Sequence, residues 1–141
     1  MQEIYRVLKP GGKFIVTTPN ILTTLTRNPW HIREYKKEEL QSLLKNFFRD
    51  IEMLGVFGND KVMSYYEENK KAVQKILKWD VLNLQYLLPR QVLQIPYDIL
   101  NRRNRKKLLQ QHNATSTLSH QDFYTEKVND KALDLFYIAQ K

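Results

Sequence analysis

The sequence of 141 residues contains no cysteine. That absence excludes a disulfide framework and any metal site built on thiolates, and it fits the reducing cytoplasm that we expect as the localisation. The chain also lacks a run of about 18 uncharged apolar residues, so we expect no transmembrane helix. Its first residues lack the apolar core of a signal peptide. With 42% hydrophobic and 27% charged residues, the composition is typical of a globular domain.

Acidic residues are scarcer than basic ones, and the surplus of positive charge is uneven. The chain has 23 Lys and Arg against 15 Asp and Glu. Residues 60–111 contain eleven Lys and Arg against five Asp and Glu, whereas residues 112–141 contain three against four. Basic surfaces attract nucleic acid, anionic lipid or phosphorylated compounds. We therefore expect any anion-binding surface to lie in the middle segment.

The first 59 residues alternate between helical and strand patterns. Residues 1–9 have the spacing of an amphipathic helix, which Pro10 and the two glycines after it end. Lys13–Thr18 is apolar on both faces, which predicts a buried strand in a parallel sheet. Lys36–Phe48 predicts a helix and Ile51–Phe57 a second strand. Strand, helix and strand in this order predict a βαβ unit with a right-handed crossover.

Residues 60–111 depart from this alternation. A helical stripe of apolar residues and the apolar run after it predict an insertion of two or three helical segments, which Pro89 and Pro96 interrupt. The polar residues 112–122 predict a loop, and Ala132–Ala139 predicts a third strand. The fold class is therefore α/β, with three strands, a crossover helix and a helical insertion.

Five strings, taken in order, carry a resemblance to a known family. They are R-V-L-K-P-G-G at 6–12, T-P-N at 18–20, H-I-R-E-Y at 31–35 with E-E-L at 38–40, F-x-x-I-E-x-x-G at 48–55, and Leu133–Lys141. Over residues 1–59 and about 112–141, the chain resembles class I S-adenosylmethionine-dependent methyltransferases of the type 11, quinone-biosynthesis-like family.

The resemblance implies a partial Rossmann-like sheet. Residues 1–141 would form the C-terminal part of one methyltransferase domain, with strands five, six and seven of the family's sheet and the helical insertion at 60–111. The last strand would run antiparallel between the first two. Because the neighbouring fourth strand would be missing, one sheet edge would be open, and we expect the chain alone to be poorly soluble or oligomeric.

The chain departs from the family pattern in two places. Lys36 stands where the family has a Thr or Ser that caps the next helix, so the usual capping bond is absent. The four glycines form no glycine-rich loop of the kind that binds S-adenosylmethionine in the family. The resemblance implies this cofactor, so we expect the N-terminal half that binds it to be missing and the chain alone to be inactive.

The function implied by the resemblance is methyl transfer from S-adenosylmethionine to a small-molecule or lipid-linked acceptor, with this chain as the substrate-side half. A second reading is a non-catalytic module whose basic insertion binds an anionic membrane surface or nucleic acid. A third is an inert truncated product. Salt-sensitive binding to anionic vesicles without any effect of cofactor would favour the second reading.

Candidate cleft residues follow the first strand. Thr18, Pro19 and Asn20 lie at its carboxyl end, where doubly wound sheets bind ligands. Asn20 either faces the substrate or cofactor cleft or forms a plain turn. His31 is the candidate catalytic base for an acceptor hydroxyl, because imidazole titrates near neutrality. Its alternative role is to form local hydrogen bonds that position the loop.

Other side chains of this loop also have two interpretations. Arg33 and Glu34 either clamp a polar substrate or form a solvated ion pair. Tyr35 and Trp30 either stack on an aromatic acceptor or pack the loop onto the sheet. We place Arg33 and Tyr35 with the cleft residues.

The insertion at 60–111 is either a lid over the active site or a structural hairpin. Its basic run offers an anion-binding surface, which is a solvated helix end, a membrane or lipid contact, or a nucleic-acid contact. We expect no metal site, because His112, His120 and Asp122 lack a firm ligand spacing. The residues of the anion-binding surface are Arg102, Arg103, Arg105, Lys106 and Lys107.

Overall fold

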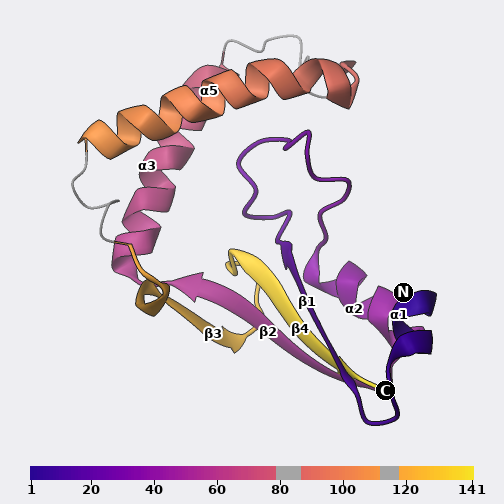
Figure 1. The fold of residues 1–141 in the computed structure, drawn as a ribbon. Helices are drawn as coiled ribbons and strands as arrows, with labels where there is room; N and C mark the ends of the chain where they lie inside the picture. The colour runs from indigo at the N-terminus through magenta and orange to yellow at the C-terminus, as the bar shows by residue number, and fades with distance from the viewer. Residues whose placement is uncertain (79–86, 112–117) are drawn as a thin grey trace. The chain divides into compact units, whose positions relative to one another are not determined.

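The structure, a computed structural model, describes residues 1–78, 87–111 and 118–141 (Figure 1). The chain divides into two compact units. Unit 1 comprises residues 1–24, 33–57 and 124–141, and unit 2 comprises residues 25–32 and 58–123.

Unit 1 is built on a sheet with the strand order β1-β4-β2-β3. The last strand, β4, runs antiparallel to both of its neighbours, and Ile138 in its middle pairs with Ile15 of β1 and Glu52 of β2. This confirms the predicted place of the last strand between the first two. The strands are β1 (Lys13–Pro19), β2 (Asp50–Gly58), β3 (Phe123–Lys127) and β4 (Asp134–Gln140).

Two strand predictions were wrong. The fourth strand, β3, was not predicted, because all five of its residues are exposed and so lack the alternation that marks a half-buried strand. The parallel setting of β1 was also wrong, since its ladder with β4 is antiparallel. Its apolar residues do not mean burial on both faces, because Ile15 is 58% exposed.

The hydrogen bonds of β1 have a fixed parity. Asn20 N–H donates to Leu133 O at one end, and Gly12 O accepts from Lys141 N–H at the other. Because antiparallel bonding alternates, the even-numbered residues between these ends bond to β4 and the odd-numbered ones face the outer edge. Pro19 falls on the outward parity, so its missing N–H removes no bond from the ladder.

Helices α1 (Gln2–Val7) and α2 (Lys37–Lys45) cover one face of the sheet (Figure 1). Phe48, just after α2, stacks on Phe14 of β1 at 6.1 Å between ring centroids and meets Tyr5 of α1 edge-on at 5.4 Å. Full burial of the Phe48 side chain, which is 2% exposed, contributes about 1.5–3 kcal/mol. The buried core consists of Leu40, Leu44, Phe48, Leu135, Tyr137 and Ala139.

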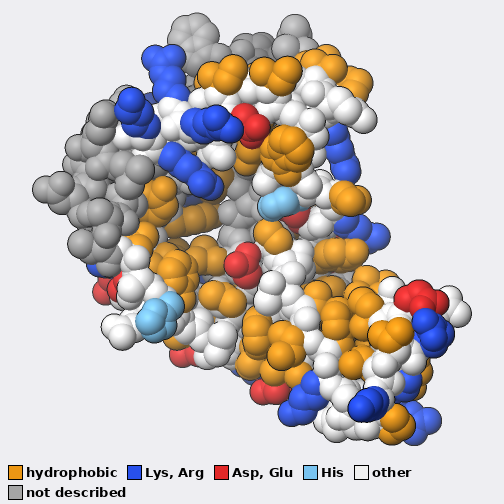
Figure 2. Space-filling view, viewed as in Figure 1, with side chains coloured by type: hydrophobic (Ala, Val, Ile, Leu, Met, Phe, Trp, Pro, Cys, Tyr) orange, Lys and Arg blue, Asp and Glu red, His pale blue; other side chains and the backbone are white. Residues whose placement is uncertain are grey.

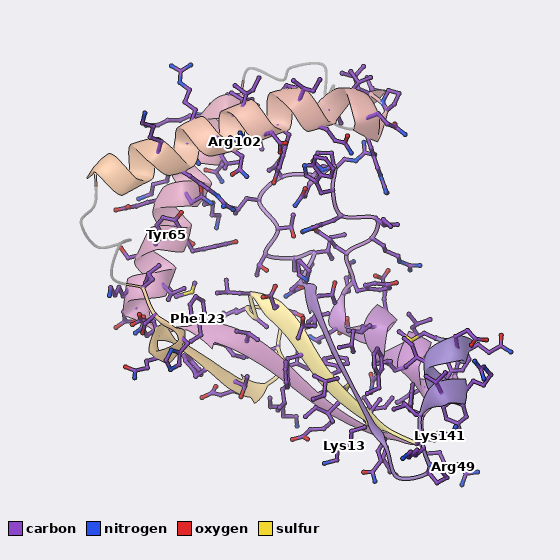
Figure 3. All side chains as sticks on the ribbon, viewed as in Figure 1. Lys13, Arg49, Tyr65, Arg102, Phe123 and Lys141 are labelled. Atoms are coloured by element: carbon purple, nitrogen blue, oxygen red, sulfur yellow. The ribbon has the colours of Figure 1, made fainter. Side chains whose placement is uncertain are left out.

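The ends of both helices follow from local chemistry. Gly11 has a φ of 76°, a left-handed conformation, in the predicted turn after α1. Beside this turn, Lys141 Nζ donates to the carbonyls of Tyr5 (2.6 Å) and Leu8 (2.8 Å) at the end of α1 (Figure 3). At α2, Lys36 has no side-chain acceptor, as predicted, but Glu39 Oε2 accepts from Lys36 N–H at 3.1 Å.

Unit 2 contains α3 (Asp60–Leu77), α5 (Arg90–Gln111) and a short 3-10 turn at His120–Asp122. Asn59 caps α3, because its Oδ1 accepts from the N–H groups of Lys61 (3.1 Å) and Val62 (3.2 Å). Asn69 of α3 and Asn104 of α5 join the two helices by a hydrogen bond of 2.8 Å.

The predicted helical character of 60–111 is confirmed where it is described, with one correction. Pro96 does not interrupt a helix but lies inside α5. A proline there lacks the N–H that would bond to the carbonyl of Val92, and its ring crowds that carbonyl, but the helix continues past it. Pro89 does precede the helix, and its carbonyl accepts from Leu93 N–H. Residues 81–86 of the predicted apolar run and the side chain of Ile76 lie outside the described residues.

In the described ranges, every helix is too short or too polar to cross a lipid bilayer.

Candidate functional site

The carboxyl end of β1 is organised around Asn20, which is 1% exposed. Its Nδ2 donates to the carbonyls of Asp130 (3.2 Å) and Ala132 (2.9 Å), and its Oδ1 accepts from Leu22 N–H (3.1 Å). Its own carbonyl accepts from Thr23 N–H at 3.0 Å. The side chain therefore fastens the segment before β4 to the end of β1.

A second segment meets the same strand end. Asn20 and Tyr35 form a parallel β-bridge, in which Ile21 N–H donates to Tyr35 O at 3.2 Å. The guanidinium carbon of the exposed Arg33 lies 4.6 Å from the centroid of the Tyr35 ring, within the range of a cation–π contact. The structure thus brings Thr18, Pro19, Asn20, Arg33 and Tyr35 together in unit 1.

Charged and phenolic groups beside this end were missed by the sequence reasoning. Lys37 Nζ forms an ion pair with Asp130, and this hydrogen bond raises the pKa of the Lys37 ammonium. Tyr137 donates its hydroxyl proton to Lys37 O at 3.1 Å. Burial, reinforced by the charge of Glu38, raises the pKa of Tyr137 to about 12. No sequence signal joins these residues, since Lys37 and Asp130 are 93 residues apart.

His31 belongs to unit 2 and sits in a local hydrogen-bonded turn. Asn28 Nδ2 lies 3.0 Å from His31 Nε2, so the amide donates to the ring nitrogen. Asn28 Oδ1 accepts from Trp30 N–H at 3.0 Å, and Asn28 O accepts from His31 N–H at 3.1 Å. A base at Nε2 would have to give up the bond from Asn28 before it took a proton. The contacts that are seen organise the turn.

Unit 2 also holds this turn against α5. The Trp30 Nε1–H donates to Asp98 Oδ1 at 3.1 Å, and Arg90 donates to Ile32 O at 2.7 Å. Trp30 therefore packs its loop on the insertion within unit 2, and its ring remains 56% exposed.

The predicted anion-binding residues lie on α5. The side chains of Arg102, Arg103, Arg105 and Lys106 are all exposed, and that of Lys107 lies outside the described part of the chain. Figure 3 marks Arg102 on this helix. Of the candidate metal residues, His112 is outside the described ranges. Within those ranges, His, Asp and Glu side chains form no group of three or more that could hold a metal ion.

Part of the chain is similar in sequence to a methyltransferase. Over 63 residues, the chain is 43% identical to a probable S-adenosylmethionine-dependent methyltransferase of Mycolicibacterium smegmatis, an alignment that covers 40% of this chain and 24% of that protein. The match supports a methyltransferase relationship. The chain therefore aligns with about a quarter of its methyltransferase relative. No protein-family model matches the chain, and no solved structure matches it.

Proposed function

We propose that this chain is the acceptor side of a methyltransferase that transfers a methyl group from S-adenosylmethionine to a small-molecule or lipid-linked acceptor. The observation that carries the proposal is the 43% identity over 63 residues to the mycobacterial methyltransferase. The antiparallel β4 between β1 and β2 supports it, because the resemblance implies the same order.

Methyl transfer from a sulfonium is an in-line displacement, so the protein mainly aligns the two reactants and excludes water. Asn20 would serve alignment by fixing the backbone at the carboxyl end of β1, where ligands of doubly wound sheets bind. Arg33 and Tyr35, held at this end by the bridge to Asn20, would contact the acceptor. Residues 60–111, with α3 and α5, would act as the lid.

The chain's own glycines do not fit the cofactor. Gly11 forms the turn after α1, and a Cβ on Gly12 would lie 2.8 Å from Lys9 O. A Cβ on Gly55 would lie 2.6 Å from that of Ala132, and one on Gly58 would lie 2.3 Å from Val62. All four are thus used in turns or close packing. We propose that residues outside these 141 bind the cofactor and that the chain alone is inactive.

Calorimetry tests the proposal. We expect no saturable heat when S-adenosylmethionine is titrated into the 141-residue chain. The same chain, extended by the codons in frame upstream of Met1, should bind the cofactor with one site per chain. An in-frame stop codon close upstream, or an extended chain that neither binds the cofactor nor methylates any lipid or soluble extract, would contradict the proposal.

A further inference from the structure

The helix α5 has two faces of different character. Its partly buried residues recur every three or four positions, so they share one face. Asn104 on this face donates to Asn69 Oδ1 of α3, so this face is the one that packs within unit 2. The partly buried residues are Arg90, Leu93, Gln94, Tyr97, Asp98, Asn101 and Asn104.

The opposite face exposes large aliphatic side chains. Val92 is 54% exposed, Ile95 70% and Ile99 61%, and their spacing of three and four residues aligns them along the helix. The exposed Leu100 flanks them. Scattered surface aliphatics need no explanation, but a continuous row of them on one helix face indicates an interaction surface.

Basic residues follow the aliphatic row on the same face of the helix. Arg102, Arg103 and Lys106 follow Ile99 by three, four and seven residues, so the same face becomes basic toward the C-terminal half of the helix. Figure 2 shows hydrophobic side chains along the upper part of α5 and Lys and Arg side chains toward its left end. Among the described residues, no carboxylate forms an ion pair with Arg102, Arg103, Arg105 or Lys106.

The helix dipole does not account for this cluster. The dipole favours cations within the last turn of a helix. α5 continues to Gln111, and its last turn contains no basic residue. The cations therefore lie more than one turn before the helix end, where the dipole stabilises them little.

We propose that the outer face of α5 docks this chain on an anionic phospholipid membrane surface. Val92, Ile95 and Ile99 enter the boundary between headgroups and acyl chains, while Arg102, Arg103 and Lys106 bind lipid phosphates. Arg105, exposed at the side of this face, adds positive charge beside them. Aliphatic side chains beside cations are what an interfacial helix requires. A nucleic-acid surface needs the cations but not the aliphatic row. The aromatic rings that stack on single-stranded bases are absent from the Asn101–Lys107 run.

Flotation with vesicles tests the proposal without any cofactor, so its outcome is separate from that of methyl transfer. The full chain is incubated with vesicles of pure phosphatidylcholine or with vesicles in which about a third of the lipid is phosphatidylglycerol. We expect binding to the anionic vesicles only, and weaker binding as salt rises.

Two variants and a control of equal charge locate the surface. Replacing Arg102, Arg103, Arg105 and Lys106 with Gln should lower the partition coefficient on the order of a thousandfold. Replacing Ile95 and Ile99 with Gln should lower it about tenfold or more. The control replaces four exposed cations of unit 1 with Gln and should bind as the wild type does. These are Lys9, Lys13, Lys45 and Arg49, of which Figure 3 marks Lys13 and Arg49.

A labelled chain tests insertion without removing the cations. Because the chain has no cysteine, one introduced cysteine carries an environment-sensitive fluorophore at a single place. The label at Ile99→Cys should shift to the blue on anionic vesicles, whereas a label at Ser42→Cys, an exposed position on α2, should not.

Four results would overturn the proposal. The first is equal binding to neutral and anionic vesicles, and the second is equal loss of vesicle binding in the charge variant and the unit 1 control. The third is an Ile95/Ile99 variant that binds vesicles as the wild type does, and the fourth is a label at position 99 that does not shift. If the Ile95/Ile99 variant binds vesicles as the wild type does, and a fluorescent RNA binds the chain and displaces it from the vesicles, the surface is one for nucleic acid.

Discussion

At the scale of single residues, Asn20 acts through its two amide hydrogens, which both point at backbone carbonyls. We expect Asn20→Asp to destabilise the fold by about 3 kcal/mol, because a carboxylate would face those carbonyls while buried. The carbonyls raise the pKa of the new carboxyl, so stability should recover as the pH falls below that pKa and its proton donates again. Urea unfolding across acidic pH measures both effects.

The control for Asn20 is Asn129→Asp. Asn129 is exposed, and its Oδ1 accepts from Lys131 N–H at 2.8 Å, a bond that an aspartate keeps. This variant should unfold within about 0.5 kcal/mol of the wild type. Equal losses of the free energy of unfolding in the two variants would show that the Asn20 side chain does not stabilise the fold through its N–H donors.

Tyr137 makes the stability of the fold depend on pH in the alkaline range. Its pKa is raised from 10.0 to about 12, so the unfolded chain loses the phenolic proton first. The contribution of the protonated Tyr137 to the free energy of unfolding is complete below pH 10.0 and is lost as the pH rises to about 12. The change is on the order of 2 kcal/mol. Tyr137→Phe should be about 1 kcal/mol less stable than the wild type at pH 7 and more stable than it near pH 12. Denaturant midpoints that keep their order across this range would contradict the assignment.

Variants of His31 and Asn28 distinguish a catalytic role of His31 from a positioning role. If His31 positions its turn, His31→Ala and Asn28→Ala should lower kcat/KM of the extended, active enzyme alike, because each removes the same bond. A catalytic base would instead lose about 10²–10⁴-fold in kcat on His31→Ala alone. We expect the equal losses, and steady-state kinetics of the two variants decides between them.

At the scale of elements, the start of α3 depends on a carboxylate. Asp122 accepts from Ser119 N–H (2.8 Å) and from Asn59 Nδ2 (2.9 Å), and Asn59 in turn caps the helix. The bond from Ser119, followed by that from Asn59, lowers the pKa of Asp122 below its usual 3.8. Its stabilisation is therefore present above pH 3.8 and is lost as the pH falls through the lowered value.

We expect Asp122→Asn to reduce the helical circular dichroism signal of the chain at neutral pH, because the start of α3 is weakened, and to flatten the decline of that signal in acid. The exposed Asp60, the first residue of α3, offers a control in Asp60→Asn. A wild type whose acid decline is unchanged by Asp122→Asn would rule out this role.

Most elements could be predicted from the sequence because their apolar residues recur at helical or strand spacing. The strand at 13–18, the helix at 36–48 and the strand at 51–57 differ from the observed ends by a few residues. The strand β3 could not be predicted, because an edge strand with five exposed residues has no apolar alternation. Pro96 misled because a proline disturbs a helix locally, by one lost hydrogen bond and a clash of its ring with the preceding turn, whereas the rest of α5 remains helical.

The candidate site was only partly accessible to sequence reasoning. The position of Asn20 at a strand end followed from T-P-N after an apolar run. Its partners did not, because they are backbone carbonyls 110 and 112 residues later, and any residue type supplies a carbonyl. The pair of Lys37 and Asp130 likewise depends on the antiparallel return of β4.

At the scale of the whole molecule, β1 is an edge strand of the sheet. Its odd-numbered residues direct their N–H groups outward, where they invite pairing with another chain. We expect the wild type to self-associate and Thr17→Pro to reduce this, because it removes an outward donor without breaking the ladder. Sedimentation velocity at several concentrations measures the change.

The control moves the proline by one residue. Thr18 has the opposite parity and pairs with Leu135, so Thr18→Pro removes a bond to β4 and should destabilise the monomer. Wild-type chains that remain monomeric with a cooperative melt would contradict the prediction.

The alternating bonding of β1 also predicts a pattern in the rates at which its amide hydrogens exchange. In deuterated water, the amides of Phe14, Val16 and Thr18 are held by β4, while those of Lys13, Ile15 and Thr17 face outward. Along one strand, slow and fast isotope exchange should therefore alternate residue by residue. When another strand joins the edge, the fast amides become slow and the alternation disappears, so an exchange map of β1 records whether this edge is occupied.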